Sequence, residues 1–187
     1  MTRNPTTGLK SGGQPCLETL LGLFYDRPEE LGRFQQVRRD DLPAAYRTLL
    51  AHDHHMTEAV EALHGGPVDV EVLAARQIDA RYARKILLHR RADGQVVQFG
   101  IVRLDFRFLQ PHVQHEIKAA AVPLGRILIE HGVLRTVRLA ALWRVTPGVD
   151  LCTCFALREP RATYGRTALI YCHAEPAVEL LEIVAPI

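Results

Sequence analysis

The first third of the chain repeats apolar residues at the spacing of one helix face. Residues 16–24, 40–53 and 56–66 place apolar side chains three and four positions apart. An aspartate that can cap a helix opens the second segment, and two glycines end the third; these are common signals for where helices begin and end. We therefore predict a helix in each segment.

After residue 67 the pattern changes toward the alternation of apolar and polar positions that is typical of strands. Residues 81–91 and 96–109 flank a short Ala-Asp-Gly-Gln sequence, which predicts a hairpin. Residues 110–132 return to helical spacing, with Pro123 placed to end one helix or begin the next. Further strands are predicted at residues 133–145, 150–157, 164–173 and 176–186, the last two joined by a tight turn. This order predicts an α+β domain built on an antiparallel sheet.

Composition narrows the class of protein. The 187 residues are 48% hydrophobic, enough for one globular core, so we expect a flexible tail at residues 1–15 and a single domain at residues 16–187. The formal net charge is only +2 and the arginines are spread along the chain; nucleic acid is therefore not an expected partner. The sequence shows neither a secretory signal nor a membrane span. We accordingly predict a cytoplasmic protein with no membrane partner, whose four cysteines are free thiols.

Arg84 is the first candidate site residue. Strand alternation places it on the same face as Tyr82, Ile86 and Leu88. A buried guanidinium without an anionic partner is costly. Arg84 should therefore meet either an internal carboxylate or the carboxylate of a ligand, and the pattern alone leaves both alternatives open.

Two glutamates in the last predicted strand are candidate internal acids. Glu179 and Glu182 lie on opposite faces of residues 176–186, and each shares its face with apolar side chains. At least one of them should therefore point inward, where burial raises the pKa of a carboxyl and suits it to proton transfer.

Histidines gather at residues 52–64 and raise the question of a metal site. A zinc site needs three or four side chains that converge, whereas a short helix and its cap point His52, His54 and His55 in different directions. We therefore expect a mostly solvated histidine face and no bound metal. Cys152 and Cys154 would face the same way on a strand, where buried structural thiols are more common than a redox or metal pair.

Four segments, taken in order, carry a family resemblance. Residues 54–61, 82–100, 121–128 and 164–186 include a Met-Thr pair, an Arg-Lys-Ile-Leu-Leu strand before an Asp-Gly turn, a Pro-Leu-Gly-Arg sequence and a Glu-Ile-Val-Ala-Pro end. Together they resemble the chorismate pyruvate-lyase family, in particular its divergent 4-hydroxybenzoate synthase branch, over roughly residues 42–187. The resemblance implies a mostly antiparallel six-stranded sheet with helical flaps over an internal ligand cavity.

The resemblance also implies an activity and a set of site residues. The family eliminates pyruvate from chorismate to give 4-hydroxybenzoate, and the expected enzyme needs no cofactor. Its ligand-contacting positions match Met56, Arg84, Leu124 and Glu182. In that assignment Arg84 holds a substrate carboxylate, Glu182 lies near the hydroxyl or ether oxygen, and Met56 and Leu124 form apolar walls. Counting from the preceding turn proline instead favours Glu179 as the acid.

A second function remains open in another class. The same fold resembles the effector-binding domains of some transcription regulators, which bind a small acidic or sugar-like ligand without reaction. We expect the roughly forty residues before Asp40 to be too few for a winged-helix DNA-binding module. The alternative is therefore a non-catalytic domain that binds a small carboxylate. The role of Arg166, structural or anion-binding, is left undecided.

Overall fold

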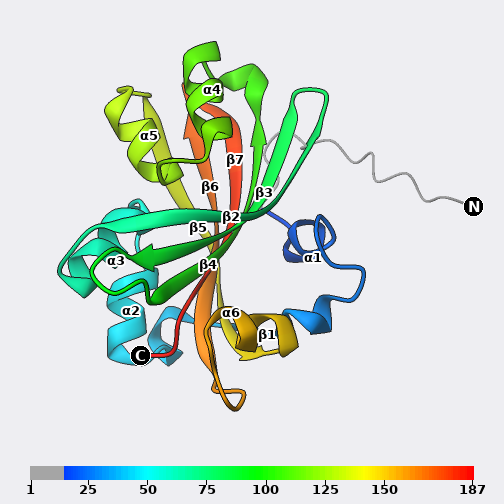
Figure 1. Ribbon diagram of the computed structural model, residues 1–187, viewed down its shortest axis with the longest axis vertical. Helices are drawn as coiled ribbons and strands as arrows, with labels where there is room; N and C mark the ends of the chain where they lie inside the picture. The colour runs from blue at the N-terminus through cyan, green and yellow to red at the C-terminus, as the bar shows by residue number, and fades with distance from the viewer. Residues whose placement is uncertain (1–14) are drawn as a thin grey trace, which may run out of the picture.

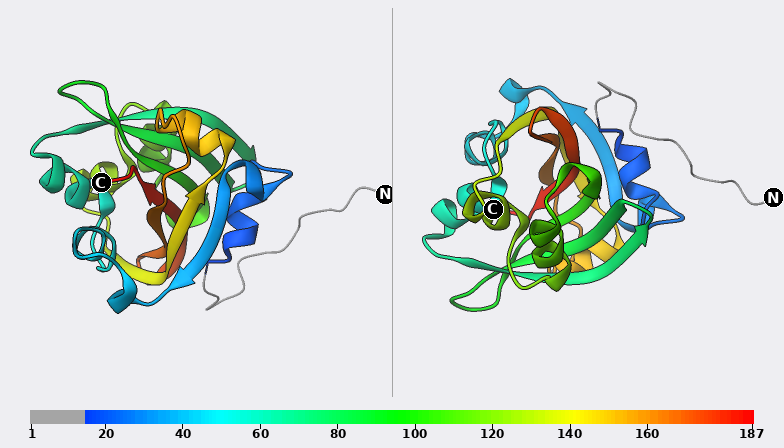
Figure 2. Two further views of the ribbon diagram at one scale, coloured as in Figure 1. Left: turned by 90° about the horizontal axis from the view of Figure 1, so that it is seen from below. Right: turned by 90° about the horizontal axis from the view of Figure 1, so that it is seen from above.

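The computed structural model describes residues 15–187, and its centre is one antiparallel sheet. The seven strands are β1 (Gly32–Val37), β2 (Val68–Ile78), β3 (Arg81–Arg90), β4 (Val96–Asp105), β5 (Arg135–Pro147), β6 (Thr163–Cys172) and β7 (Glu175–Val184). Their order across the sheet is β1-β5-β6-β7-β4-β3-β2. The sheet is strongly twisted and curves round the centre of the molecule (Figures 1 and 2). The predicted α+β class and antiparallel sheet are thus confirmed.

Helices cover both faces of this sheet. They are α1 (Leu17–Leu21), α2 (Ala44–Leu50), α3 (Met56–His64), α4 (Pro111–Ala119), α5 (Leu124–Glu130) and α6 (Val149–Cys154), with short 3-10 turns η1 (Pro28–Glu30), η2 (Arg39–Asp41) and η3 (Phe106–Phe108). The apolar residues of α2 to α5 pack on one face, and those of α1 and α6 pack on the other. No helix of residues 15–187 combines the length and apolar character needed to cross a membrane.

We call the side under α3 and α5 the cavity face and the side under α1 and α6 the opposite face. Alternate residues of β3, β4 and β7 divide between them: Ile86, Val102 and Leu180 pack on the cavity face, whereas Leu87, Ile101 and Leu181 pack on the opposite face. Because both faces are covered, β7 is an almost continuous apolar run. Polar residues in such a run are therefore buried on whichever face they occupy.

Two predictions about the strands are wrong. The sheet has seven strands, not six, because Gly32–Val37 pairs with β5 as an edge strand. This segment is rich in polar residues and half exposed, so it lacks a clear alternating signal. The predicted strand at 150–157 is instead α6, which begins directly after Gly148 at the end of β5. Cys152 and Cys154 therefore lie on a helix and do not share a strand face.

The remaining predicted helices and strands overlap elements of the same type, with shorter bounds at several ends. Gly65 has a left-handed backbone (φ +67) and ends α3, as predicted. Pro123 is the N-cap directly before α5, after α4 has ended at Ala119. Of the predicted tail at residues 1–15, all but the last residue lie outside the part that the structure describes.

Candidate functional site

An internal cavity lies between the cavity face and the first turns of α3 and α5. Its walls come from the flaps at His55–Thr57 and Pro123–Gly125 and from inward side chains of β2 to β7. The cavity volume open to the centres of water molecules is about 40 Å³, room for a few waters. A larger ligand therefore requires α3 and α5 to move apart.

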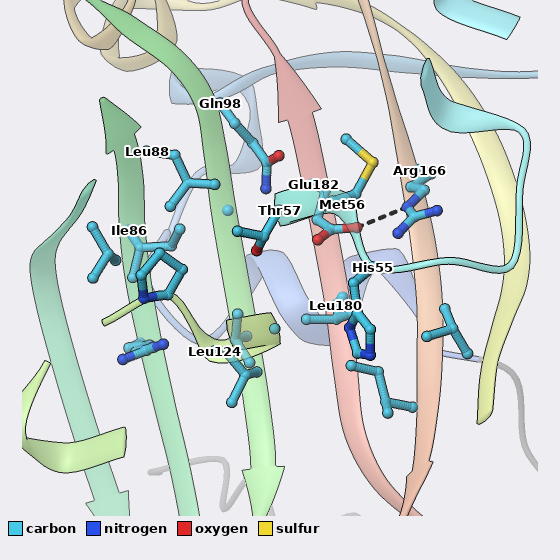
Figure 3. Close-up of a pocket in the computed structure, with 18 residues that line it drawn as sticks. His55, Met56, Thr57, Ile86, Leu88, Gln98, Leu124, Arg166, Leu180 and Glu182 are labelled. Carbon is cyan, nitrogen blue, oxygen red and sulfur yellow. Dashed lines mark hydrogen bonds and ion pairs between the residues drawn. The ribbon is translucent and has the colours of Figure 1, made fainter. Parts of the chain in front are cut away.

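Strand register arranges the floor of the cavity in three rows. The first row joins Arg84, Val102 and Leu180, the second joins Ile86, Gly100, Glu182 and Arg166, and the third joins Leu88 and Gln98. Figure 3 shows the Gln98 side chain toward one end of the cavity and Leu124 and Leu180 toward the other. Arg84 and Gln98 thus lie in the outer rows, and the row between them holds Ile86, Gly100 and the Glu182–Arg166 pair.

Arg84 is buried without an anionic partner. Its side chain is 1% exposed, and its Nη1 donates to the carbonyl of Ile117 in the last turn of α4 at 3.1 Å. Within residues 15–187 its Nε has no hydrogen-bond partner and no carboxylate forms an ion pair with it. Burial accordingly lowers the pKa of the Arg84 guanidinium. Of the two partners that the sequence left open for Arg84, an internal carboxylate is therefore not found among the described residues.

Glu182 lines the cavity and is paired with Arg166. The two are directly opposite each other on β7 and β6, and Arg166 Nε donates to the carboxylate at 2.7 Å. Arg166 also donates to the carbonyls of His52 and His54, at 2.9 and 3.0 Å. Arg166 therefore connects the sheet to the loop before α3. Its positive charge balances the negative charge of the Glu182 carboxylate.

Glu179, the alternate candidate, lies on the opposite face. It forms an ion pair with Arg103, its direct neighbour on β4. Burial raises the pKa of the Glu179 carboxyl, and the Arg103 charge opposes that shift. The sheet separates this pair from the cavity, so of the two glutamates only Glu182 is placed to contact a ligand there.

The two flaps meet at the mouth of the cavity. Met56 and Leu124 are the first residues of α3 and α5, and both line the cavity. Gly125 packs so closely against α3 that an added Cβ would lie 2.9 Å from Thr57 Oγ1 and 3.4 Å from His55 Nδ1. The glycine of the Pro-Leu-Gly sequence is therefore what lets the flaps close.

Sequence reasoning placed His55 on a solvated face, and this is wrong for that residue. His55 is buried, and its Nε2 accepts a hydrogen bond from Arg135 Nε at 2.6 Å. Burial and the charges of Arg135 and Arg166 lower its pKa to about 4, so the ring is neutral at pH 7. Within residues 15–187 no three His, Cys, Asp or Glu side chains are grouped to hold a metal ion.

Gln98 was not recognised as a candidate from the sequence. It is 3% exposed, lines the cavity and has a side-chain oxygen without a partner among the described residues. A signal was present, because Gln98 is in phase with Gly100 and Val102 in an otherwise apolar run. A polar residue on a buried strand face needs a partner just as Arg84 does.

Comparisons with known proteins bear on the fold. No family model matches the chain, and no curated protein matches it. Among solved structures, PhnF from Mycobacterium smegmatis aligns with 72% of this chain at 13% identity and a TM-score of 0.50, and its separate effector domain aligns with 71% at 14% identity and a TM-score of 0.50. The match spans 64% of the full PhnF chain and 88% of the effector domain.

Two further structures are similar. The gene product SA0254 from Staphylococcus aureus matches 72% of this chain and 90% of its own, with 7% identity and a TM-score of 0.51. The ligand-binding domain of a putative GntR-family transcriptional regulator from Bordetella bronchiseptica matches 63% of this chain and 85% of its own, with 12% identity and a TM-score of 0.47. The chain shares the chorismate lyase-like fold of the PhnF effector domain.

These comparisons correct the predicted activity. The sequence predicted a chorismate lyase that releases 4-hydroxybenzoate and pyruvate, but the PhnF neighbour with a TM-score of 0.50 is described as an effector domain. The geometry gives a physical reason. Glu182, the expected proton-transfer group, is held in a buried ion pair with Arg166. The prediction of an enzyme is therefore wrong.

Proposed function

We propose that this chain is a non-catalytic binding domain for a small carboxylate, which enters the cavity and places its anionic group against Arg84. Met56 and Leu124 form the apolar flaps above the ligand. Glu182, with Arg166, forms the polar part of the floor.

The observation that carries the proposal is the uncompensated charge of Arg84. Two arginines are buried in residues 15–187, and Arg166 has a carboxylate partner whereas Arg84 has none. An unpaired buried cation is strongly disfavoured. A ligand carboxylate would supply both the missing negative charge and an acceptor for Nε. A hydrogen bond to a charged group contributes about 1.5–3 kcal/mol of binding free energy. The likeness to the PhnF effector domain supports a small-molecule partner.

The test is thermal stabilisation by a panel of small acids. Benzoate, 4-hydroxybenzoate, gluconate and chorismate represent carboxylates, and glucose 6-phosphate represents phosphates. At least one carboxylate should raise the melting temperature in a concentration-dependent way, because a ligand that binds only the folded state stabilises it. Stabilisation by the phosphate alone would contradict the carboxylate assignment, and release of aromatic product from chorismate would contradict a binding-only function.

Neighbouring residues of β3 provide a matched pair of variants. Arg84→Met should abolish the stabilisation by the acid. Lys85→Met removes a charge from the next position, which faces away from the cavity and pairs with Asp150, and should leave ligand stabilisation intact. Equal responses of the two variants to the acid would overturn the role of Arg84.

The same likeness bears on a second partner. The sequence gave no reason to expect nucleic acid, but a GntR-family transcriptional regulator acts on DNA, and one fold neighbour is a domain of such a regulator. The sequence-based prediction that the chain has no nucleic-acid partner is therefore one that needs an experiment. A gel-shift assay of the full chain with genomic DNA fragments, with and without the stabilising acid, would test it.

A further inference from the structure

Two buried polar atoms lack partners, and both belong to residues of the cavity. Among the buried side-chain nitrogen and oxygen atoms in the described part of the chain, these are Arg84 Nε and Gln98 Oε1. Folded proteins pair nearly all such groups. Two orphaned atoms in one cavity point to a single occupant that pairs both.

The two atoms require opposite chemistry. Arg84 Nε is a donor and needs an acceptor, whereas Gln98 Oε1 is an acceptor and needs a donor. Figure 3 shows the Gln98 side chain pointing toward Thr57 and Glu182, and the Glu182 carboxylate of the next row, which accepts from Arg166, is a second acceptor near this end. A hydroxyl or ammonium group suits such an end, and a hydroxyl pairs with the carboxamide in either orientation of its oxygen and nitrogen.

The rows between these atoms define the middle of the ligand. Arg84 is opposite Val102, and Gln98 lies four residues earlier on β4, roughly 13 Å along the strand. The row between them holds Ile86 and Gly100 beside the Glu182–Arg166 pair, whereas Leu180 lies in the row of Arg84. At Gly100 an added Cβ would lie 3.2 Å from the Ile86 side chain, so the glycine keeps the floor open. The interval therefore has an apolar wall at Ile86 and a polar wall at the Glu182–Arg166 pair, and a ligand that spans it places its polar groups at the two ends.

We propose that the cavity selects a small carboxylate that carries a hydroxyl or ammonium group at the end opposite its carboxylate, and that Gln98 recognises this group. The inference rests on the proposed function, because it assumes that Arg84 holds the carboxylate. It adds a specificity residue and a polarity for the ligand.

Matched pairs of acids test the polarity. 4-Hydroxybenzoate is compared with 4-methylbenzoate, and the longer 3-(4-hydroxyphenyl)propionate with 3-(4-methylphenyl)propionate, by calorimetric titration of the full chain. In at least one pair the hydroxy acid should bind about tenfold more tightly, because the methyl compound leaves the buried amide unpaired. Equal affinity within both pairs would overturn the proposal.

Two glutamine variants separate recognition from structure. Gln98→Met keeps a similar volume and should reduce the preference for the hydroxy acid to less than about threefold. Gln114, whose amide donates to the carbonyls of Phe106 and Leu109 at 2.8 Å, serves as the control. Gln114→Met should lower the melting temperature and leave the preference unchanged.

A third measurement needs no ligand. Because the buried Gln98 oxygen has no partner within residues 15–187, Gln98→Met should leave the melting temperature of the free protein unchanged or raise it. A fall as large as that of Gln114→Met would show a structural role and overturn the inference. If other carboxylates bind through Arg84 but neither matched pair binds, the inference fails alone; if no carboxylate binds, the proposed function fails.

Discussion

The two faces of the sheet bury similar charges and differ in how these charges balance. Each face holds one Arg–Glu pair across neighbouring strands: Arg166–Glu182 on the cavity face and Arg103–Glu179 on the opposite face. Consecutive residues of β3 show the difference. Lys85 on the opposite face has Asp150 as its partner, whereas Arg84 on the cavity face has no carboxylate partner among the described residues.

This difference teaches that a buried ion pair is a poor marker of a binding site. On the opposite face, Lys85 and Arg103 each have a carboxylate partner, Asp150 and Glu179 respectively. The cavity face keeps one guanidinium in excess and one unpaired amide oxygen. The imbalance, and not the burial of charge, distinguishes the face to which we assign ligand binding.

Arg166→Met should have the largest effect on stability. The change leaves Glu182 buried without its cation and removes the donors to the carbonyls of His52 and His54. The free energy of unfolding, measured by urea denaturation, should fall by about 3–5 kcal/mol. A loss below about 1 kcal/mol would mean that water reaches Glu182 and that the pair is not a buried one.

The pH dependence of stability should differ in sign between the faces. The pKa of His55 is about 4 in the folded protein and about 6.5 in an unfolded chain, so the unfolded state binds the extra proton between these values. The contribution of the neutral His55 ring to the free energy of unfolding is present above pH 6.5. As pH falls toward 4, this contribution is lost, and the free energy of unfolding falls by about 2–3 kcal/mol. The raised pKa of Glu179 acts in the other direction, because its contribution is lost as pH rises through the folded pKa.

Urea unfolding between pH 7 and pH 4.5 checks both signs. His55→Gln keeps an acceptor for Arg135 and should flatten the fall in stability. Glu179→Gln should not flatten it, because that residue favours the folded state as pH falls. An unchanged profile in His55→Gln would show that the buried ring is not the titrating group.

Gly125→Ala should separate the flaps of the cavity face. The new Cβ would lie 2.9 Å from Thr57 Oγ1, and such overpacking costs about 1–3 kcal/mol. Adding Thr57→Ala should recover most of the loss in melting temperature. Gly66→Ala is the control, since nothing lies within 4 Å of its added Cβ; an equal loss there would remove the explanation by flap contact.

The smallest effect is expected from removing a whole ion pair on the opposite face. The double variant Arg103→Met/Glu179→Leu leaves no unpaired charge from that pair, and its free energy of unfolding should stay within about 1 kcal/mol of wild type. Stabilisation by the small carboxylate should be unchanged. Loss of that stabilisation in a folded double variant would break the division between the two faces.

Much of the fold could be predicted because the spacing of apolar side chains along the chain follows from the local backbone geometry of helices and strands. The hairpin of β3 and β4, the hairpin of β6 and β7 and the start of α5 after Pro123 follow from alternation, turn residues and proline. The edge strand β1 and helix α6 did not, because short polar or mixed segments carry no decisive period. The inward position of Arg84 was also predicted from alternation alone.

The sequence by itself determined that Arg84 and a glutamate of the last strand lie on apolar faces, and it could not say what they meet. Only the tertiary structure decided that Glu182 pairs with Arg166 and Glu179 with Arg103, and that Arg84 Nε and Gln98 Oε1 lie in one cavity without partners among residues 15–187. The physical reason is register. Alternation fixes the face of each residue within its own strand, whereas its neighbours come from strands far away in the chain, and their alignment depends on how the whole sheet packs.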